Sequence, residues 1–313
     1  MLLSPIALHI PDGFLSLTIS IIFWVATLVM VGLAIIKTNK TLGEKQIPLM
    51  GVMAAFIFAA QMLNFPVAGG TSGHFLGGAL AAIVLGPWAG ILVMTAVVAV
   101  QGLLFQDGGL LVMGANIFNM GILTAAIGFG LYRMVVNQNK GIRFTVAGVG
   151  AWVSTMAAAL LTSLQLWISG TSRLEIVVPA MLGVHALIGL GEGLITAGAL
   201  AFIEQTRPDL LSAKKTTTSG GRGWIYAGII ISILAVLLSP FASGSPDGLE
   251  RVAEDIGFLE RGMDAPYEIL PDYTIPFLGE TGLSTILAGV IGALILLGIL
   301  ILIGRSLRKP EKV

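Results

Sequence analysis

The stretch LTISIIFWVATLVMVGLAII, residues 17–36, holds twenty consecutive residues without a charged side chain. A helix of about 20 apolar residues is long enough to cross the hydrocarbon core of a bilayer. The rest of the 313-residue chain is similar, since 56% of its residues are hydrophobic, 11% are charged and its mean hydropathy is +0.94. Soluble domains carry about 25% charged residues. The composition therefore predicts an all-α integral membrane protein.

Apolar runs of this kind predict about nine transmembrane helices, over residues 17–36, 47–65, 74–86, 88–105, 110–132, 144–168, 178–203, 224–241 and 283–304. The third run is short, and Gly86-Pro87 separates it from the fourth. Proline lacks an amide hydrogen and disfavours helix at the residue before it. We therefore expect a tight turn between two spans there, and not one kinked helix.

The basic residues predict the orientation of these helices. With the N-terminus outside and the C-terminus inside, the inner segments hold fourteen of the 17 basic residues. They are Lys37, Lys40, Lys45, Arg133, Lys140, Arg143, Arg207, Lys214, Lys215, Arg222, Arg305, Arg308, Lys309 and Lys312, which leaves Arg173, Arg251 and Arg261 outside. This bias is the one that the positive-inside rule requires.

The chain divides at a polar, basic linker. Residues 206–223 are rich in Ser, Thr and Gly, which is typical of a linker. We expect residues 8–205 to form a core of seven helices and residues 224–313 to form a module of two helices. Residues 242–282 between those two helices contain nine acidic residues, either as a solvated loop or as a segment that docks a partner or attracts cations. Residues 1–7 lack the basic start of a signal peptide and are expected to lie outside the core.

A candidate metal site comes from the histidines. The chain has three histidines and no cysteine, and His9 and His74 both lie in polar, glycine-rich breaks between apolar runs. Without a thiolate, imidazole and backbone nitrogen are the donors for a borderline metal such as Ni(II), Cu(II) or Co(II). A histidine at the second position of a chain offers three of them: the terminal amine, its own amide nitrogen and its imidazole. The alternative is that His74 is an ordinary hydrogen-bonded histidine at the membrane interface.

Several motifs resemble one family. LHIPDGFLS, PVAGGTSGHFLGG, LGPWAG, GANIFNMG and VHALIGLGEGLITA, spread over residues 8–205, are similar to the substrate-capture components of nickel and cobalt energy-coupling-factor transporters, the CbiM/NikM family. Pro246-Asp247-Gly248-Leu249-Glu250 resembles the PDGLE-type accessory component of the same transporters. The resemblance implies high-affinity capture and translocation of Co²⁺ or Ni²⁺ across a prokaryotic cell membrane. It also implies a membrane coupling subunit and ABC-type ATPase subunits as partners, and no cofactor beyond the transported ion.

The same resemblance implies a set of ligands. In the family the amine of the initiating methionine, the following histidine and the histidine of the GGTSGH loop bind the metal, which corresponds to Leu8, His9 and His74. Leu8 stands where the family has methionine. Because the leucine codons TTG and CTG can initiate translation in bacteria, we expect the mature chain to begin at residue 8.

Further polar residues within the apolar runs are candidates for supporting this site. His185 and Glu192 are seven residues apart, so two helical turns place them on one face. There they form a structural pair, make polar contacts between helices or support the ligands. Asp12 either orients an imidazole or caps the first helix. The remaining candidates are amides, which form hydrogen bonds between helices or to the histidines: Asn64, Gln101, Asn116 and Asn119.

Two other functions are alternatives to transport of a metal ion. An intramembrane metalloenzyme is disfavoured because the chain lacks H-E-x-x-H, so we expect no enzymatic activity. A channel for a small solute is the second alternative. The chain also lacks the phosphate-binding G-x-x-x-x-G-K-[ST] motif, so ATP hydrolysis is expected in partner subunits. The residues do not distinguish cobalt from nickel.

Overall fold

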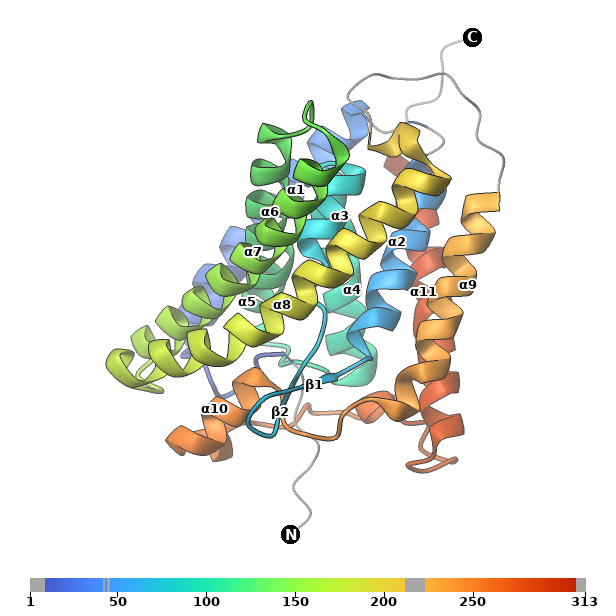
Figure 1. Cartoon of the computed structure of the whole chain (residues 1–313). Helices are drawn as coiled ribbons and strands as arrows, with labels where there is room; N and C mark the ends of the chain where they lie inside the picture. Colours follow the sequence, from blue (N-terminus) through green and yellow to red (C-terminus); the bar gives the residue numbers. More distant parts are fainter. Residues whose placement is uncertain (1–8, 42, 44–45, 212–222, 308–313) are drawn as a thin grey trace.

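The structure is a computed structural model that describes residues 9–41, 43, 46–211 and 223–307. Within these residues the chain forms a bundle of helices with one short hairpin (Figure 1). The helices are α1 (Leu17–Thr41), α2 (Gln46–Gln61), α3 (Gly78–Leu85), α4 (Pro87–Val100), α5 (Met113–Ile117), α6 (Thr124–Met134), α7 (Lys140–Ile168), α8 (Leu174–Thr206), α9 (Gly223–Leu238), α10 (Gly248–Ile256) and α11 (Gly282–Leu307). The hairpin pairs β1 (Phe65–Val67) antiparallel with β2 (Thr71–Gly73).

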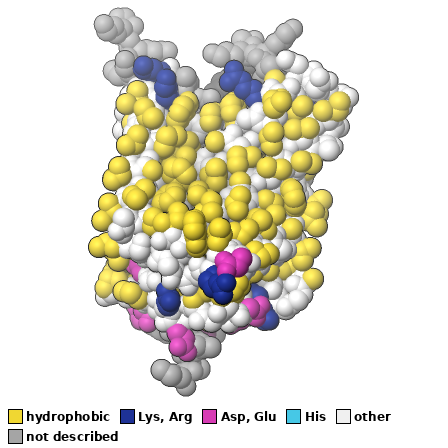
Figure 2. Space-filling view, turned by 90° about the vertical axis from the view of Figure 1, so that its left-hand side faces the viewer, with side chains coloured by type: hydrophobic (Ala, Val, Ile, Leu, Met, Phe, Trp, Pro, Cys, Tyr) yellow, Lys and Arg dark blue, Asp and Glu magenta, His cyan; other side chains and the backbone are white. Residues whose placement is uncertain are grey.

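The bundle is a multi-pass membrane protein. Among the described residues, seven helical stretches are long and apolar enough to cross a bilayer: Leu17–Lys40, Pro87–Phe105, Met113–Met134, Lys140–Ile168, Leu174–Thr206, Gly223–Phe241 and Gly282–Leu307. Two of them contain π-helical turns, at Gln101–Phe105 and Phe118–Leu123. Large apolar side chains remain exposed along α1, α9 and α11. Figure 2 shows one side of the bundle, on which hydrophobic side chains form a broad band and charged side chains lie toward its two ends.

The structure corrects the expected span over residues 74–86. Helix covers only Gly78–Leu85, which is about 12 Å long and too short to cross the bilayer. The residues before it form the hairpin and an irregular segment, and α2 ends at Gln61 instead of residue 65. The expected turn is confirmed, since Gly86 has a φ of +85° and α4 begins at Pro87. A non-helical segment is tolerated at membrane depth where it is enclosed by protein or lines a cavity.

Helices α9 and α11, in the C-terminal part of the chain, pack against α2. A Cβ atom at Gly292 of α11 would lie 2.3 Å from the Phe58 ring, and one at Gly304 would lie 2.7 Å from Ile47. A Cβ at Gly228 of α9 would lie 2.4 Å from Val52. Small residues therefore allow these helices to approach closely, as is common between membrane helices. One face of α2 is thereby buried inside the chain.

The two ends of the bundle differ in charge. Residue 9, the hairpin and α10 lie at one end, and the α6–α7 turn and the C-terminal end of α11 lie at the other (Figure 1). The helix ends at the second end hold the described inner basic residues Lys37, Lys40, Arg133, Lys140, Arg143, Arg207 and Arg305. The prediction that the first end faces outward follows from this separation and the positive-inside rule.

Labelling of single cysteines measures this orientation. The chain has no native cysteine, so Gln138→Cys in the α6–α7 turn and Glu254→Cys on α10 each introduce one exposed thiol. A membrane-impermeant maleimide applied to intact cells is expected to label Glu254→Cys, and to label Gln138→Cys only after the membrane is permeabilised. Labelling of both from the same side would contradict the orientation.

Candidate metal centre

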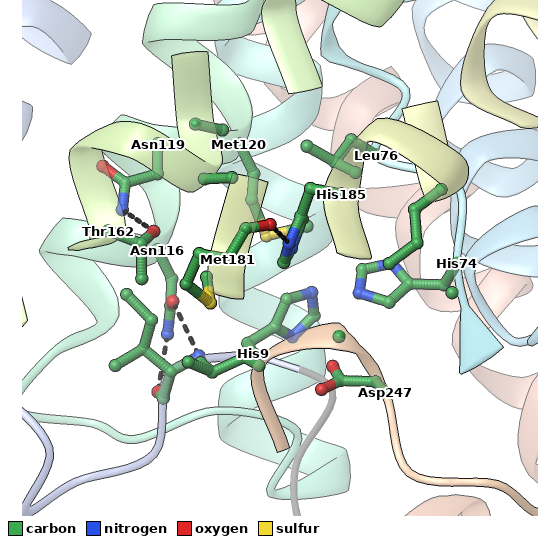
Figure 3. A pocket seen from close by; sticks show the side chains of 17 residues that line it. His9, His74, Leu76, Asn116, Asn119, Met120, Thr162, Met181, His185 and Asp247 are labelled. Carbon is green, nitrogen blue, oxygen red and sulfur yellow. Dashed lines mark hydrogen bonds between the residues drawn. The ribbon is translucent and has the colours of Figure 1, made fainter. Parts of the chain in front are cut away.

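All three histidines of the chain line one small cavity of about 70 Å³ at the end of the bundle that carries α10. The ring centroids of His9 and His74 are 5.5 Å apart, with the ring planes at 79°. His185 of α8 faces the same space (Figure 3). The other walls come from Ile10, Gly73, Leu76, Asn116, Asn119, Met120, Ala158, Ala159, Thr162, Met181, Ile188, Asp247, Gly248 and Leu249. The cavity therefore gathers imidazoles from three distant parts of the sequence.

His9 is fixed by its neighbours on both sides. Asn116 on α5 accepts a hydrogen bond from the Ile10 amide at 3.1 Å and donates one to the Ile10 carbonyl at 3.0 Å. The His9 Nδ1 atom lies 2.9 Å from Asp107 Oδ1 and 3.0 Å from the Asp107 carbonyl oxygen. The His9 Nε2 atom is buried and has no hydrogen-bond partner among the described residues. A buried polar atom without a partner is costly, so only one of the two ring nitrogens of His9 is satisfied in this orientation of the ring.

Charge couples His9 to Asp107. Burial alone would lower the pKa of the His9 imidazole, but the charge and hydrogen bonds of Asp107 outweigh burial and raise that pKa. Burial alone would raise the pKa of Asp107, but His9, together with a hydrogen bond from Tyr273, holds it below its usual value. A metal ion that binds His9 must therefore displace a proton that Asp107 stabilises.

Tyr273, in the C-terminal module, contacts the pair formed by His9 and Asp107. The Tyr273 hydroxyl donates to Asp107 Oδ2 at 2.6 Å and accepts a hydrogen bond from Gln101 at 3.1 Å. Its ring stacks on Phe105, with centroids 4.7 Å apart. Gln101 thus supports the site indirectly, through Tyr273 and Asp107.

Replacement of Tyr273 by phenylalanine tests this support. Tyr273→Phe keeps the stacked ring and removes the donor to Asp107, so the variant should lose about 1–3 kcal/mol of stability, the cost of leaving a buried polar group unpaired. Thermal unfolding of the purified protein measures the effect. Tyr267→Phe is the control, since the hydroxyl of this half-buried tyrosine donates to the Leu103 carbonyl in a solvent-exposed hydrogen bond. Equal melting temperatures for Tyr273→Phe and wild type would contradict this role.

His74 is the residue directly after strand β2 of the hairpin. A Cβ atom at Gly73 would lie 2.6 Å from Ile188 of α8, so glycine lets β2 press against that helix. The His74 Nδ1 atom lies 3.2 Å from the Phe75 carbonyl oxygen. The Glu192 carboxylate, 1% exposed, accepts hydrogen bonds from the Leu76 and Gly77 amides at 2.6 and 3.0 Å. Glu192 thereby satisfies the amides before α3, where the predicted helix is broken.

His185 and Glu192 consequently do not form a pair. The His185 Nδ1 atom bonds the Met181 carbonyl one turn earlier in α8, at 2.8 Å. Its ring lines the cavity, whereas Glu192 binds the backbone before α3. Asn119, in a π-helical turn, lines the cavity and bonds Thr162 and Gln165 of α7. These contacts hold α7 and α8 around the histidines.

Two candidates lie away from the cavity. The Asp12 carboxylate accepts hydrogen bonds from the Leu110, Leu111 and Val112 amides at 2.9 to 3.1 Å. Asp12 thus fixes the segment before α5, a role that differs from the two expected ones, orienting an imidazole and capping the first helix. The Asn64 side chain is not part of the cavity wall. The Asn64 backbone carbonyl accepts a hydrogen bond from the Ser243 amide at 2.8 Å. Leu8 lies outside the described residues.

Two acidic residues at the site were not predicted. Asp107 lies in Gln106-Asp107-Gly108-Gly109, a polar, glycine-rich break like those around His9 and His74, and this similarity was the available signal. Asp247, near the start of the acidic segment 242–282, also lines the cavity. Because it lies far from His9 and His74 in the sequence, the sequence did not indicate this. Burial raises the pKa of Asp247 to about 7, and a hydrogen bond from the Glu250 amide offsets part of that effect.

The side chains alone do not complete a metal site. Among the described residues, no three His, Asp or Glu side chains are grouped closely enough to hold an ion. Two imidazoles whose centroids are 5.5 Å apart can share one ion if backbone nitrogens supply the other donors. An arrangement rich in nitrogen suits Ni(II) and Cu(II).

Comparison with known proteins identifies the family. The family model for the cobalt uptake substrate-specific transmembrane region, CbiM, matches residues 9–210, and the PDGLE domain matches residues 222–309. A putative fused nickel transport protein NikMN of Archaeoglobus fulgidus is 39% identical over 295 residues, covering 93% of this chain and 96% of the relative. The cobalt transport protein CbiM of Sorangium cellulosum is 34% identical and covers 65% of this chain.

A solved structure agrees with this assignment. The crystal structure of a truncated transition metal transporter superposes with a TM-score of 0.57 at 32% identity, covering 63% of this chain and 98% of that one. The relatives are transport proteins, in agreement with a transporter subunit and not an enzyme. With a family model that matches more than half of its length, the chain belongs to the CbiM family of transition metal uptake proteins, joined to a PDGLE domain.

Proposed function

We propose that this chain captures Ni²⁺ as the substrate-specific subunit of an ATP-driven transporter of the energy-coupling-factor type. The observation that carries the proposal is the meeting of all three histidines on one buried cavity. Nickel is favoured over cobalt for two reasons. The relatives with the same fused organisation, from Archaeoglobus fulgidus and Rhodobacter capsulatus, are named nickel transport proteins. Nitrogen donors in a square plane also suit Ni(II).

The proposed ligands are the amine of residue 8, the amide and imidazole of His9, and the imidazole of His74. The chelate formed by an amide and its own imidazole uses Nδ1, which lies 2.9 Å from Asp107 Oδ1 in the structure. Metal binding therefore requires the His9 ring to turn away from Asp107. Tyr273 remains hydrogen-bonded to the Asp107 carboxylate and compensates in part for that loss.

Nickel uptake by cells tests the proposed function. Cells expressing the chain with a coupling subunit and an ATPase subunit are expected to accumulate ⁶³Ni²⁺, and an inactive ATPase variant should abolish the accumulation. Omission of the chain itself is the matched control. Accumulation that persists with the inactive ATPase would contradict the proposal and favour a channel.

A further inference from the structure

The PDGLE segment closes one side of the histidine cavity. The Ser72 amide of β2 donates to the Pro246 carbonyl at 2.8 Å, and the Ser72 hydroxyl donates to the Ser245 carbonyl at 2.7 Å. A Cβ atom at Gly248 would lie 2.9 Å from His185 Cε1 and 2.8 Å from Ile188. The segment thus seats against the hairpin and α8, and Asp247 sits between these contacts.

Asp247 is an acidic residue at a position whose structural role does not require one. It caps α10 through a hydrogen bond from the Glu250 amide to Asp247 Oδ1 at 2.7 Å. Asparagine and serine cap helices about as well as aspartate. Asp247 is 4% exposed, and burying a carboxylate is expensive unless a cation or hydrogen bonds compensate. Capping alone therefore does not account for an anion at this position.

The surroundings of Asp247 supply the compensation. Asp247 lies beside His9 and His74 (Figure 3), and it is the only acidic side chain among the residues that line the cavity. The unpartnered Nε2 atom of His9 belongs to the same cavity. Asp107, the other nearby carboxylate, does not line the cavity and accepts the hydrogen bond of the Tyr273 hydroxyl. A cation held by the histidines would therefore be neutralised most directly by Asp247.

We propose that Asp247 is the anionic component of the metal site, so that the PDGLE segment completes a site whose nitrogen donors lie in the core. This inference rests on the proposed function. A divalent ion with one deprotonated amide ligand keeps one positive charge, which a single carboxylate balances. The PDGLE segment then acts on affinity directly, by electrostatic stabilisation of the bound divalent transition metal ion.

The test is Asp247→Asn in the full chain, with Asp255→Asn as its matched control. Both variants lie at α10 and remove one negative charge, but Asp255 is exposed and pairs with Arg251. Asparagine preserves the helix cap, so the melting temperature without metal should not change. The Ni²⁺ dissociation constant of Asp247→Asn should rise about tenfold or more, since removal of a residue that supports metal ligands typically has an effect of this size. The dissociation constant of Asp255→Asn should match that of the wild type.

The outcomes separate this inference from the proposed function. A wild-type dissociation constant for Asp247→Asn, with loss of Ni²⁺ binding in His9→Ala, would overturn the inference alone. Weaker binding accompanied by a lower melting temperature without metal would also overturn it, because the effect would then come from the fold. Unchanged binding in His9→Ala would overturn the proposed function instead.

Discussion

His9→Ala and His74→Ala are each expected to abolish high-affinity Ni²⁺ binding while the protein still inserts into the membrane. Each substitution removes one proposed donor, so the loss should exceed the roughly 10–100-fold that removal of a ligand's hydrogen-bonding partner costs. The two rings come from segments that are far apart in sequence and meet at one cavity. Neither segment can replace the donor of the other. Equilibrium titration of the purified variants with Ni²⁺ measures the loss.

His185→Ala is the control for these two variants. His185 lines the same cavity, but its Nδ1 atom bonds the Met181 carbonyl within α8 and its ring packs against Gly248. Its removal should lower the melting temperature and change the Ni²⁺ affinity less than His9→Ala or His74→Ala does. Loss of binding in His185→Ala combined with retention in His74→Ala would show that the proposed ligand set is wrong.

A chain that begins at residue 8 is expected to bind Ni²⁺ far more tightly than a chain that retains residues 1–7. In the longer chain the nitrogen of residue 8 belongs to a peptide bond, whose lone pair is delocalised. The longer chain thus lacks the donor amine and the first chelate ring. Loss of the amine and loss of the chelate ring both weaken binding of the same ion. The difference in Ni²⁺ affinity between the two chains should therefore be comparable to the loss of affinity in His9→Ala or His74→Ala.

Two expressed forms make this comparison. The first begins at Met1, and the second lacks residues 1–7 and carries Leu8→Met, which restores the family's Met-His start. Intact-mass analysis establishes where each purified chain begins, and Ni²⁺ titration gives the affinities. A chain that keeps residues 1–7 and binds Ni²⁺ as tightly as the shorter form would refute the amine ligand and leave His9 and His74 with other co-ligands.

The sequence was sufficient to predict the helical membrane fold, because each long apolar run is a local signal. It was not sufficient for the segment between α2 and α4. The run over 74–86 is apolar enough for a helix, but Glu192 binds the Leu76 and Gly77 amides from a distant helix. That contact stabilises the irregular backbone before α3. Local hydropathy does not reveal a contact between residues that are more than a hundred positions apart in the sequence.

The same distinction applies to the site. The motifs around His9 and His74 indicated that these residues belong together, and the structure brings their rings to one cavity. Asn116 was expected to bond either another helix or a histidine, and it bonds the backbone of Ile10, the residue after His9. Asp107 and Asp247 were missed because their roles depend on tertiary packing. The acidic segment had two open interpretations, and its first carboxylate lies inside the cavity wall.

The most direct test of the account is Ni²⁺ binding by the purified chain that begins at residue 8, combined with X-ray absorption at the nickel edge. The account predicts one Ni²⁺ per chain with a first coordination shell of nitrogen atoms, and no bound Ni²⁺ in His74→Ala. A first shell composed of oxygen atoms, or a full equivalent of Ni²⁺ retained in His74→Ala, would contradict it.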